Sequence, residues 1–440
     1  MNRHTMDDLR YFQAMPLDVK IAMTKQRIRE WVAYYGTDGV YVSFSGGKDS
    51  TVLLDIVRQY DRRIKAMFVD IPTQYPELRQ FVNQFENVDV IRPKIGFVEV
   101  CEKYGFPLIS KEVSECVQGA KKYLTNILNE RNDLTDRQTD RQTDRQTDRQ
   151  TDSGYYADCV NRLTGTGKYK KKENIPNVDQ LSLVAPSRGG TIENIVKSEE
   201  LANLLNERMK NKRGGNNQRL AIMLGMLTKD KEQPIKANIP NDDRSMFSLE
   251  KYGFFLESPF EISNKCCSAM KKKPAHDYYK QTGRVPITAQ MADESRLRTQ
   301  QWLRNSCNGF NLKIPTSNPM AFWTEQDVLQ YIKQNNLPIC SVYGDVVTDD
   351  EEMGQMQIAD YDGFEEFRRG GDHLHCTGCQ RTGCVCCGFG AHINGDRRFE
   401  LLKETHPQMY KLLDIAKNNG YTMREAIEWV NKHGNLNIKL

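Results

Sequence analysis

The feature that most constrains this chain is a short turn, residues 45–50 (SGGKDS), between two apolar segments. Residues 39–44 are typical of a buried strand, and residues 51–57 continue as an apolar helix. A tight turn that joins a strand to a helix places the start of the helix at the end of the strand. The segment therefore predicts an α/β unit with a binding loop.

The residues of this loop favour an anion as the ligand. Gly46 and Gly47 let the backbone turn and approach a ligand closely. Free N–H groups at the start of the helix attract negative charge. Lys48 adds a positive charge, and Ser45 and Ser50 add hydroxyl groups. The loop lacks the Gly-x-x-x-x-Gly-Lys spacing of a Walker A motif, so it predicts a phosphate site of another kind.

Further strands and helices follow the same rhythm. Residues 1–35 carry apolar positions at helical spacing, and residues 64–70 and 88–91 are typical of strands. Strand, helix and strand in succession predict a parallel sheet with crossover helices and an α/β fold. We expect N-terminal helices and the first half of this domain in 1–110, a flexible insertion in 111–245, the second half of the domain in 246–345, and a cysteine-rich, helical C-terminal part in 346–440.

Two later helices carry sequence signals of their own. Thr324 and Asp327 are spaced as a capping box at the start of a helix. A last helical segment is expected from about Arg398 to His433.

Composition and hydropathy argue against a membrane-spanning protein and against a secreted one. Lys and Arg exceed Asp and Glu by 62 to 58, so the net charge of +4 gives no strong basic field. No stretch reaches the roughly 18 apolar residues of a membrane helix, and the N-terminus lacks the apolar core of a secretory signal. We expect a cytoplasmic protein without a membrane partner.

The predicted insertion contains a perfect Thr-Asp-Arg-Gln repeat over 135–152. A four-residue period without an apolar member cannot bury a face, which predicts a solvated tether or a polar helix. The four residues can be encoded by ACA GAC AGA CAG, the tetranucleotide ACAG read in triplets. We hypothesise a slippage-prone gene whose reading frame switches with the number of units; the alternative is an ordinary repeated linker.

Basic segments also lie in this part of the chain. A lysine-rich run covers 168–172, and Arg-Gly-Gly occurs at 188–190 and 213–215. Such segments contact nucleic acid in some proteins and are solvated surface in others. Nucleic acid or a partner protein stays open as a ligand.

The twelve cysteines are unevenly distributed, with five between Cys376 and Cys387 and an adjacent pair at Cys266 and Cys267. Cys-x-x-Cys spacings in a chain without a secretory signal favour metal ligation over disulfides. Four cysteines suit a structural zinc ion or an iron–sulfur cluster.

Taken together, these motifs resemble those of the PP-loop ATP pyrophosphatases, whose signature is Ser-Gly-Gly-x-Asp-Ser, and among them the phosphoadenosine phosphosulfate reductase family. The resemblance includes the acidic strand end and aromatic-Pro-Glu turn of 70–77, the Glu-Ser-x-x-Arg segment in 292–298, and the helix start at 322–328 with 336–338 and 342–344 after it. The double cysteine with the lysines at 271–273 resembles a segment of the reductases that carry an iron–sulfur cluster.

The resemblance implies a function for individual residues. Residues 45–50 would hold pyrophosphate with Mg²⁺, and Asp70 and Glu77 would border the adenosine. Glu294, Ser295 and Arg298 would face the acceptor or sulfur donor. The expected catalytic residues are Lys48, Asp49 and Arg298, and the nucleotide-binding residues are Ser45, Gly46, Gly47, Lys48, Asp49, Ser50, Asp70, Glu77, Glu294 and Ser295. The resemblance favours a [4Fe–4S] cluster over zinc, with candidate ligands Cys266, Cys267, Cys379, Cys384 and Cys387.

Two departures separate the chain from a typical sulfonucleotide reductase. Met291 occupies the place where sulfonucleotide-binding members commonly carry arginine. No cysteine follows Cys387, whereas assimilatory reductases attack their substrate with a cysteine in a C-terminal tail.

We therefore expect an ATP-dependent enzyme that cleaves between the α- and β-phosphates, adenylylates an acceptor and functions in sulfur transfer. The alternatives are a sulfonucleotide reductase with an atypical nucleophile and a nucleotide-binding module of a nucleic-acid modification or defence complex.

Overall fold

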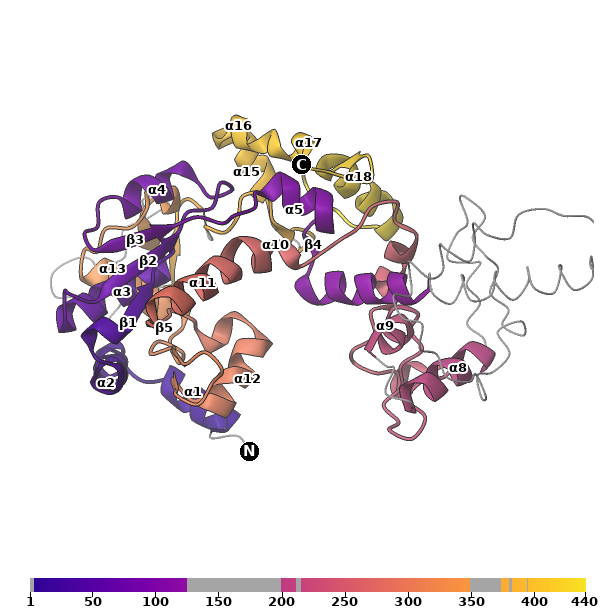
Figure 1. The fold of residues 1–440 in the computed structure, drawn as a ribbon, viewed down its shortest axis with the longest axis horizontal. Helices are drawn as coiled ribbons and strands as arrows, with labels where there is room; N and C mark the ends of the chain where they lie inside the picture. The colour runs from indigo at the N-terminus through magenta and orange to yellow at the C-terminus, as the bar shows by residue number, and fades with distance from the viewer. Residues whose placement is uncertain (1–3, 125–198, 211–214, 349–372, 380–381, 394) are drawn as a thin grey trace, which may run out of the picture. The chain divides into compact units, whose positions relative to one another are not determined.

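The structure is a computed structural model that describes residues 4–124, 199–210, 215–348, 373–379, 382–393 and 395–440. The chain forms two compact units (Figure 1). Unit 1 contains residues 1–100, 265–387 and 398–416, and unit 2 contains residues 101–264, 388–397 and 417–440. The repeat at 135–152 and the basic segments at 168–172 and 188–190 lie outside the described residues.

Unit 1 is built on a six-stranded sheet in the order β3-β2-β1-β5-β7-β6. All neighbouring strands are parallel except β6 and β7. This mostly parallel sheet with flanking helices is the PP-loop α/β fold that the sequence predicts. The strands are β1 (Val40–Ser43), β2 (Lys65–Val69), β3 (Val88–Ile91), β5 (Val285–Ile287), β6 (Asn308–Gly309) and β7 (Thr316–Ser317).

Helices cover the central strands of this sheet. Val40, Tyr41 and Val42 are all buried, as expected of a parallel strand with both faces covered. Helix α3 (Lys48–Tyr60) packs on β1, and α2 (Leu17–Tyr35) and α13 (Glu325–Gln334) pack on α3 (Figure 1).

The strand order determines where a ligand site can lie. The chain moves from β1 to β2 and β3 on one side, and β5 lies on the other side of β1. The turn after β1 is thus at the point where the strand order reverses, where open α/β sheets bind ligands.

Unit 1 contains a set of further helices, helical turns and a strand pair. They are α1 (Met6–Gln13), α4 (Pro76–Val82), α10 (Lys265–Cys267), a π-helical turn η6 (Ser268–Lys272), α11 (Lys273–Thr282), η7 (Ala292–Glu294), α12 (Arg296–Asn305), η8 (Ser341–Tyr343), the antiparallel pair β8 (Val346–Thr348) and β9 (Leu374–Cys376), α15 (Arg398–Thr405), α16 (Pro407–Tyr410) and α17 (Leu412–Ile415).

Unit 2 has its own core. Lys121 donates to the carbonyl oxygens of Ser258 and Phe260 at 2.8 and 3.1 Å and pairs with Glu261. The elements are β4 (Leu108–Ile109), paired in parallel with β10 (Gly388–Phe389), the helical residues 111–124, α8 (Glu199–Lys210), α9 (Gly215–Met223), η4 (Asn241–Asp243), η5 (Glu250–Glu257), the hairpin of β11 (Lys417–Asn418) and β12 (Tyr421–Thr422), and α18 (Met423–Gly434).

The expected last helical segment is interrupted. Pro407 starts a new short helix after His406. Asn419 and Gly420 have positive φ values of 50° and 85°, which form the turn between β11 and β12. The helix periodicity in 398–433 therefore belongs to four helices and a hairpin rather than to one segment. None of the helices in the described ranges is both long enough and apolar enough to span a bilayer.

Candidate active site

The turn after β1, residues 45–50, has the geometry of an anion-binding loop and is called the phosphate loop below. Gly46 has φ of +75°, and a Cβ at this position would lie 3.0 Å from Val82 Cγ2 and 3.2 Å from Leu78 Cδ2. Both the backbone conformation and the packing of α4 therefore require glycine. Gly47 is the N-cap of α3, so the first N–H groups of that helix face the loop.

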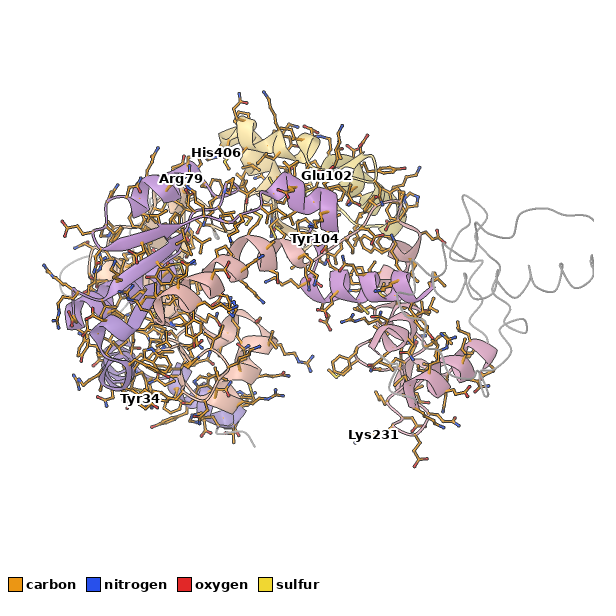
Figure 2. The ribbon with its side chains drawn as sticks, in the orientation of Figure 1. Tyr34, Arg79, Glu102, Tyr104, Lys231 and His406 are labelled. Atoms are coloured by element: carbon orange, nitrogen blue, oxygen red, sulfur yellow. The ribbon has the colours of Figure 1, made fainter. Side chains whose placement is uncertain are left out.

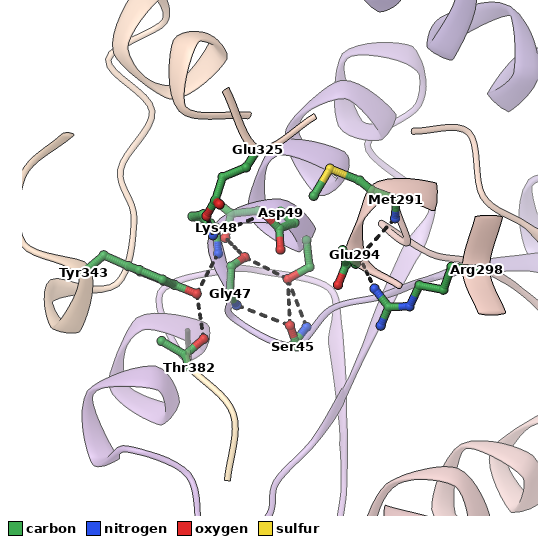
Figure 3. Close-up of polar contacts among 12 residues, drawn as sticks. Ser45, Gly47, Lys48, Asp49, Met291, Glu294, Arg298, Glu325, Tyr343 and Thr382 are labelled. Carbon is green, nitrogen blue, oxygen red and sulfur yellow. Dashed lines mark hydrogen bonds and ion pairs between the residues drawn. The ribbon is translucent and has the colours of Figure 1, made fainter. Parts of the chain in front are cut away.

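The two serines of the loop form hydrogen bonds with each other and with the loop backbone. Ser45 Oγ lies 3.0 Å from Ser50 Oγ and accepts a hydrogen bond from Gly47 N at 3.3 Å. Ser50 Oγ donates to Gly47 O at 2.9 Å (Figure 3). The hydroxyls therefore fix the shape of the loop, in addition to any contact with a ligand.

Lys48 brings the positive charge predicted from the sequence, and the structure adds a counterion that the sequence did not reveal. Its side chain is 6% exposed, and its ammonium lies 2.9 Å from Glu325 Oε1, at the start of α13 (Figure 3). Asp49 Oδ1 lies 3.7 Å away. Burial lowers the pKa of Lys48, but Asp49 and Glu325 more than offset this, so its pKa is above its ordinary value.

Asp49 is in a different environment. Its Oδ1 atom is buried and has no hydrogen-bond partner in the structure. Burial raises the pKa of Asp49, Lys48 lowers it, and Glu294 and Glu325 raise it further, so that it lies above its ordinary value. Perturbed carboxylates of this kind are typical of functional sites.

Tyr343 contacts the phosphate loop through its hydroxyl group. Its hydroxyl accepts a hydrogen bond from Lys48 N at 3.2 Å and lies 2.6 Å from Thr382 Oγ1 (Figure 3). Burial raises the pKa of Tyr343 to about 12, so the hydroxyl stays protonated near neutral pH. Tyr343 and Thr382 are functional candidates that sequence reasoning missed, although Tyr343 lies in a segment that carried the family resemblance.

The segment at 292–298 also lies beside the loop. Glu294 accepts a hydrogen bond from Met291 N at 3.0 Å and forms an ion pair with Arg298 (Figure 3). Ser295 is the N-cap of α12 and accepts from Arg298 N at 3.4 Å. Since Glu294 affects the pKa of Asp49, the structure brings the expected acceptor-facing residues to the phosphate loop.

Asp70 has partners of its own. Its carboxylate is 4% exposed and accepts hydrogen bonds from Arg79 and Arg92. Burial alone would raise the pKa of Asp70, but these hydrogen bonds lower it below its usual range. Both carboxylate oxygens are therefore engaged by the protein.

Glu77 is likewise paired. It lies in the first turn of α4, and His406 Nε2 lies 3.1 Å from its Oε1 atom. Figure 2 labels both Arg79 and His406, the partners of Asp70 and Glu77. In this structure Asp70 and Glu77 both form ion pairs with protein side chains, and these pairs fix the conformation of the chain after β2.

The candidate cysteine ligands divide into two groups. Lys271, in the π-helical turn, is within electrostatic range of the thiols of Cys384, Cys267, Cys387 and Cys266. Burial lowers the pKa of Lys271, and these four groups together raise it above its ordinary value.

Cys379 has a separate environment, because its thiol lies 3.6 Å from the Tyr75 hydroxyl. Cys386 is fully buried in the core. Across the described residues, no group of three or more Cys, His, Asp or Glu side chains could by itself hold a metal ion.

Backbone hydrogen bonds hold the cysteine-rich segment beside the phosphate loop. Cys379 N donates to Val342 O, and Gly378 N donates to Tyr343 O, both at 2.8 Å. Val385 N donates to Thr73 O at 2.8 Å. The cysteine-rich segment is thus anchored both to η8 and to the chain after β2.

The fold and this loop define a PP-loop α/β protein whose glycine turn lies at the switch point of its sheet. The family model for the phosphoadenosine phosphosulfate reductase domain matches residues 39–149 and 230–389, together more than half of the chain. The chain therefore belongs to the phosphoadenosine phosphosulfate reductase family. No curated protein matches it.

Proposed function

We propose that this protein is an ATP-dependent enzyme that cleaves the nucleotide between its α- and β-phosphates and transfers the adenylyl group to an acceptor, in a sulfur-transfer reaction. The observation that carries the proposal is the buried Lys48 side chain at the N-terminus of α3, beside a glycine turn in which Gly46 has a positive φ and leaves little room for a Cβ. Such a site stabilises charge that develops on departing pyrophosphate.

The residues of the loop fit a nucleotide that carries Mg²⁺. Mg²⁺ binds through one or two carboxylates together with the phosphates of its substrate, rather than through a complete protein cage. Asp49 Oδ1 is a buried oxygen without a hydrogen-bond partner among the described residues, and Glu325 lies on the other side of Lys48 from it. In this proposal Asp49 would hold the ion, and the ion would neutralise phosphate charge.

Each remaining side chain then has a task of its own. Lys48 would bind the β- and γ-phosphates, and the α3 N–H groups would orient them. Arg298, held by Glu294, would face the α-phosphate and the acceptor. Tyr343 would fix the first N–H group of the helix.

Measuring pyrophosphate release from ATP with Lys48→Ala tests this proposal. Loss of one preorganised charge from such a site typically costs about 10²-fold or more in rate. The matched control is Lys280→Ala, which removes an exposed lysine from α11. Equal pyrophosphate release by both variants and the wild type would contradict the assignment of the loop.

A sulfonucleotide reductase is the second candidate, and family membership is the observation that favours it. Cys379 is a half-buried thiol outside the group around Lys271, so it is the candidate nucleophile. Sulfite release from adenosine phosphosulfate or phosphoadenosine phosphosulfate with a thiol reductant, lost in Cys379→Ser, would identify this reaction; no sulfite release from either substrate would exclude it.

We also propose that Cys266, Cys267, Cys384 and Cys387 hold a [4Fe–4S] cluster, with zinc as the alternative. The support is that all four thiols lie within electrostatic range of one ammonium, which would offset the negative charge of a thiolate-bound cluster. The four cysteine sulfur atoms that bind a [4Fe–4S] cluster lie farther from one another than the four that bind a single tetrahedral zinc ion. Cys379, bonded to Tyr75, would lie outside this ligand set.

A further inference from the structure

The charges around the phosphate loop are unusual for a site that receives a polyanion. Among the residues that the structure describes around the loop, two cations, Lys48 and Arg298, face three carboxylates, those of Asp49, Glu294 and Glu325. Each cation already has a carboxylate partner in the structure. A nucleotide that arrives without a cation would therefore add its own negative charge to a cluster that is already negative.

Glu325 is the carboxylate that faces solvent at this cluster. Its side chain is 54% exposed, whereas the Lys48 side chain that it contacts is buried. The side chains of Asp49 and Glu294 are 32% and 30% exposed, so Glu325 is the most accessible of the three carboxylates to an entering ligand.

The backbone of Glu325 is firmly fixed. Thr324 is the N-cap of α13, and Asp327 completes a capping box with it. Both oxygens of Asp327 also lie 2.7 Å from Lys20 Nζ, whose side chain is 2% exposed. Because the start of α13 is anchored in this way, the backbone of Glu325 stays beside the phosphate loop even if its side chain rotates away from Lys48.

We propose that Glu325 is a specificity-determining residue that makes the loop select a polyphosphate carrying a divalent cation over the same polyphosphate without one. This inference rests on the proposed function, because it specifies the charge state of the nucleotide that the loop accepts. A cation-free polyphosphate meets an unscreened carboxylate at Lys48, whereas the cation of a complexed polyphosphate lies between the two negative groups and is attracted by both.

The test compares the binding of ATP and of inorganic pyrophosphate with Mg²⁺ and with a chelator, measured by titration calorimetry. The quantity of interest is the ratio of the dissociation constants without and with Mg²⁺. In Glu325→Gln, which keeps the shape and removes the charge, we expect this ratio to fall about tenfold or more, since opposing like charges are costly at a binding site. Tighter binding of the cation-free ligand should account for most of the fall.

Glu404→Gln is the matched control, because it removes an exposed carboxylate on α15 and should leave the ratio unchanged. Glu325→Ala provides a second variant without the charge, and thermal unfolding checks that both variants fold. A ratio in Glu325→Gln equal to that of the wild type would overturn the inference, as would an equal gain in affinity for both forms of the ligand.

The outcome also separates this inference from the proposed function. If the wild type binds ATP and pyrophosphate with Mg²⁺ and only the ratio is insensitive to Glu325, the inference fails and the nucleotide site stands. If the wild type binds neither ligand under either condition, the proposed function fails and the inference fails with it.

Discussion

At the scale of single residues, Asp70 offers the clearest test of electrostatics in the fold. Its buried carboxylate accepts hydrogen bonds from two arginines, of which Arg92 is 76% exposed. Hydrogen bonds to a charged group contribute about 1.5–3 kcal/mol. We expect Asp70→Asn to lower the free energy of unfolding by about 1–3 kcal/mol near neutral pH, measured by urea denaturation. Asp7→Asn, in an exposed pair with Arg10, should change it by less than about 1 kcal/mol.

The pH dependence of this effect has a defined sign. The folded-state pKa of Asp70 is lowered, so its ionised form stabilises the fold above the unfolded-state pKa of about 3.9. That contribution is lost as the pH falls through the lower folded-state pKa. The stabilities of the wild type and Asp70→Asn should therefore converge in acid; a constant difference down to the lowest measurable pH would show that Asp70 acts by packing alone.

Sequence reasoning found the residues of the loop and missed their partners for a physical reason. Lys48 lies in a local motif with a recognisable spacing, but Tyr343 approaches it across 295 residues of sequence. Glu325 directly follows Thr324, whose capping role was visible, yet nothing local indicates an ion pair with Lys48. Long-range partners of this kind depend on how the strands are ordered in the sheet.

At the scale of elements, α13 connects helix capping to the binding site. Thr324 Oγ1 accepts a hydrogen bond from Asp327 N at 3.4 Å, and loss of this N-cap contact should cost about 1 kcal/mol of stability in Thr324→Ala. Thr422→Ala is a matched control, because Thr422 and Glu425 form a similar capping box on α18 in unit 2. Both variants should lose similar stability in urea denaturation, and only Thr324→Ala should change the affinity for Mg²⁺-ATP. An affinity change of equal size in both variants would contradict a specific role for the start of α13.

The elements also show which local patterns are reliable. Strands were expected at 39–44, 64–70 and 88–91, and β1, β2 and β3 lie within these ranges. The apolar runs of β1 and β2 are buried as expected of inner parallel strands, whereas β3 is an edge strand in which Val90 is exposed. The capping box at Thr324 was confirmed because its partners are only three residues apart. The hairpin at 417–422 was missed, since its turn depends on the positive φ values of Asn419 and Gly420 within a helix-like pattern.

At the scale of the whole molecule, the cysteine-rich segment links distant parts of unit 1. Cys267 and Cys384 are separated by more than a hundred residues of sequence, yet both lie near Lys271. A cluster bound to both segments would close a long loop, and its binding free energy would add to the stability of the fold. The sequence indicated such a link through the spacing of its cysteines, but only the fold shows that Lys271 lies among them.

This link predicts the behaviour of anaerobically purified protein. The wild type should be brown, with broad visible absorbance, and Cys384→Ser should lose the colour and expose the C-terminal part of unit 1 to limited proteolysis. Cys386→Ala is the control: its thiol belongs to the buried core, so the variant should keep both the colour and the wild-type fragment pattern. A colourless wild type with one zinc ion per chain would overturn the cluster and keep the link. A metal-free wild type whose fragments match those of Cys384→Ser would overturn both, because the four thiols would then surround Lys271 without binding anything that connects them.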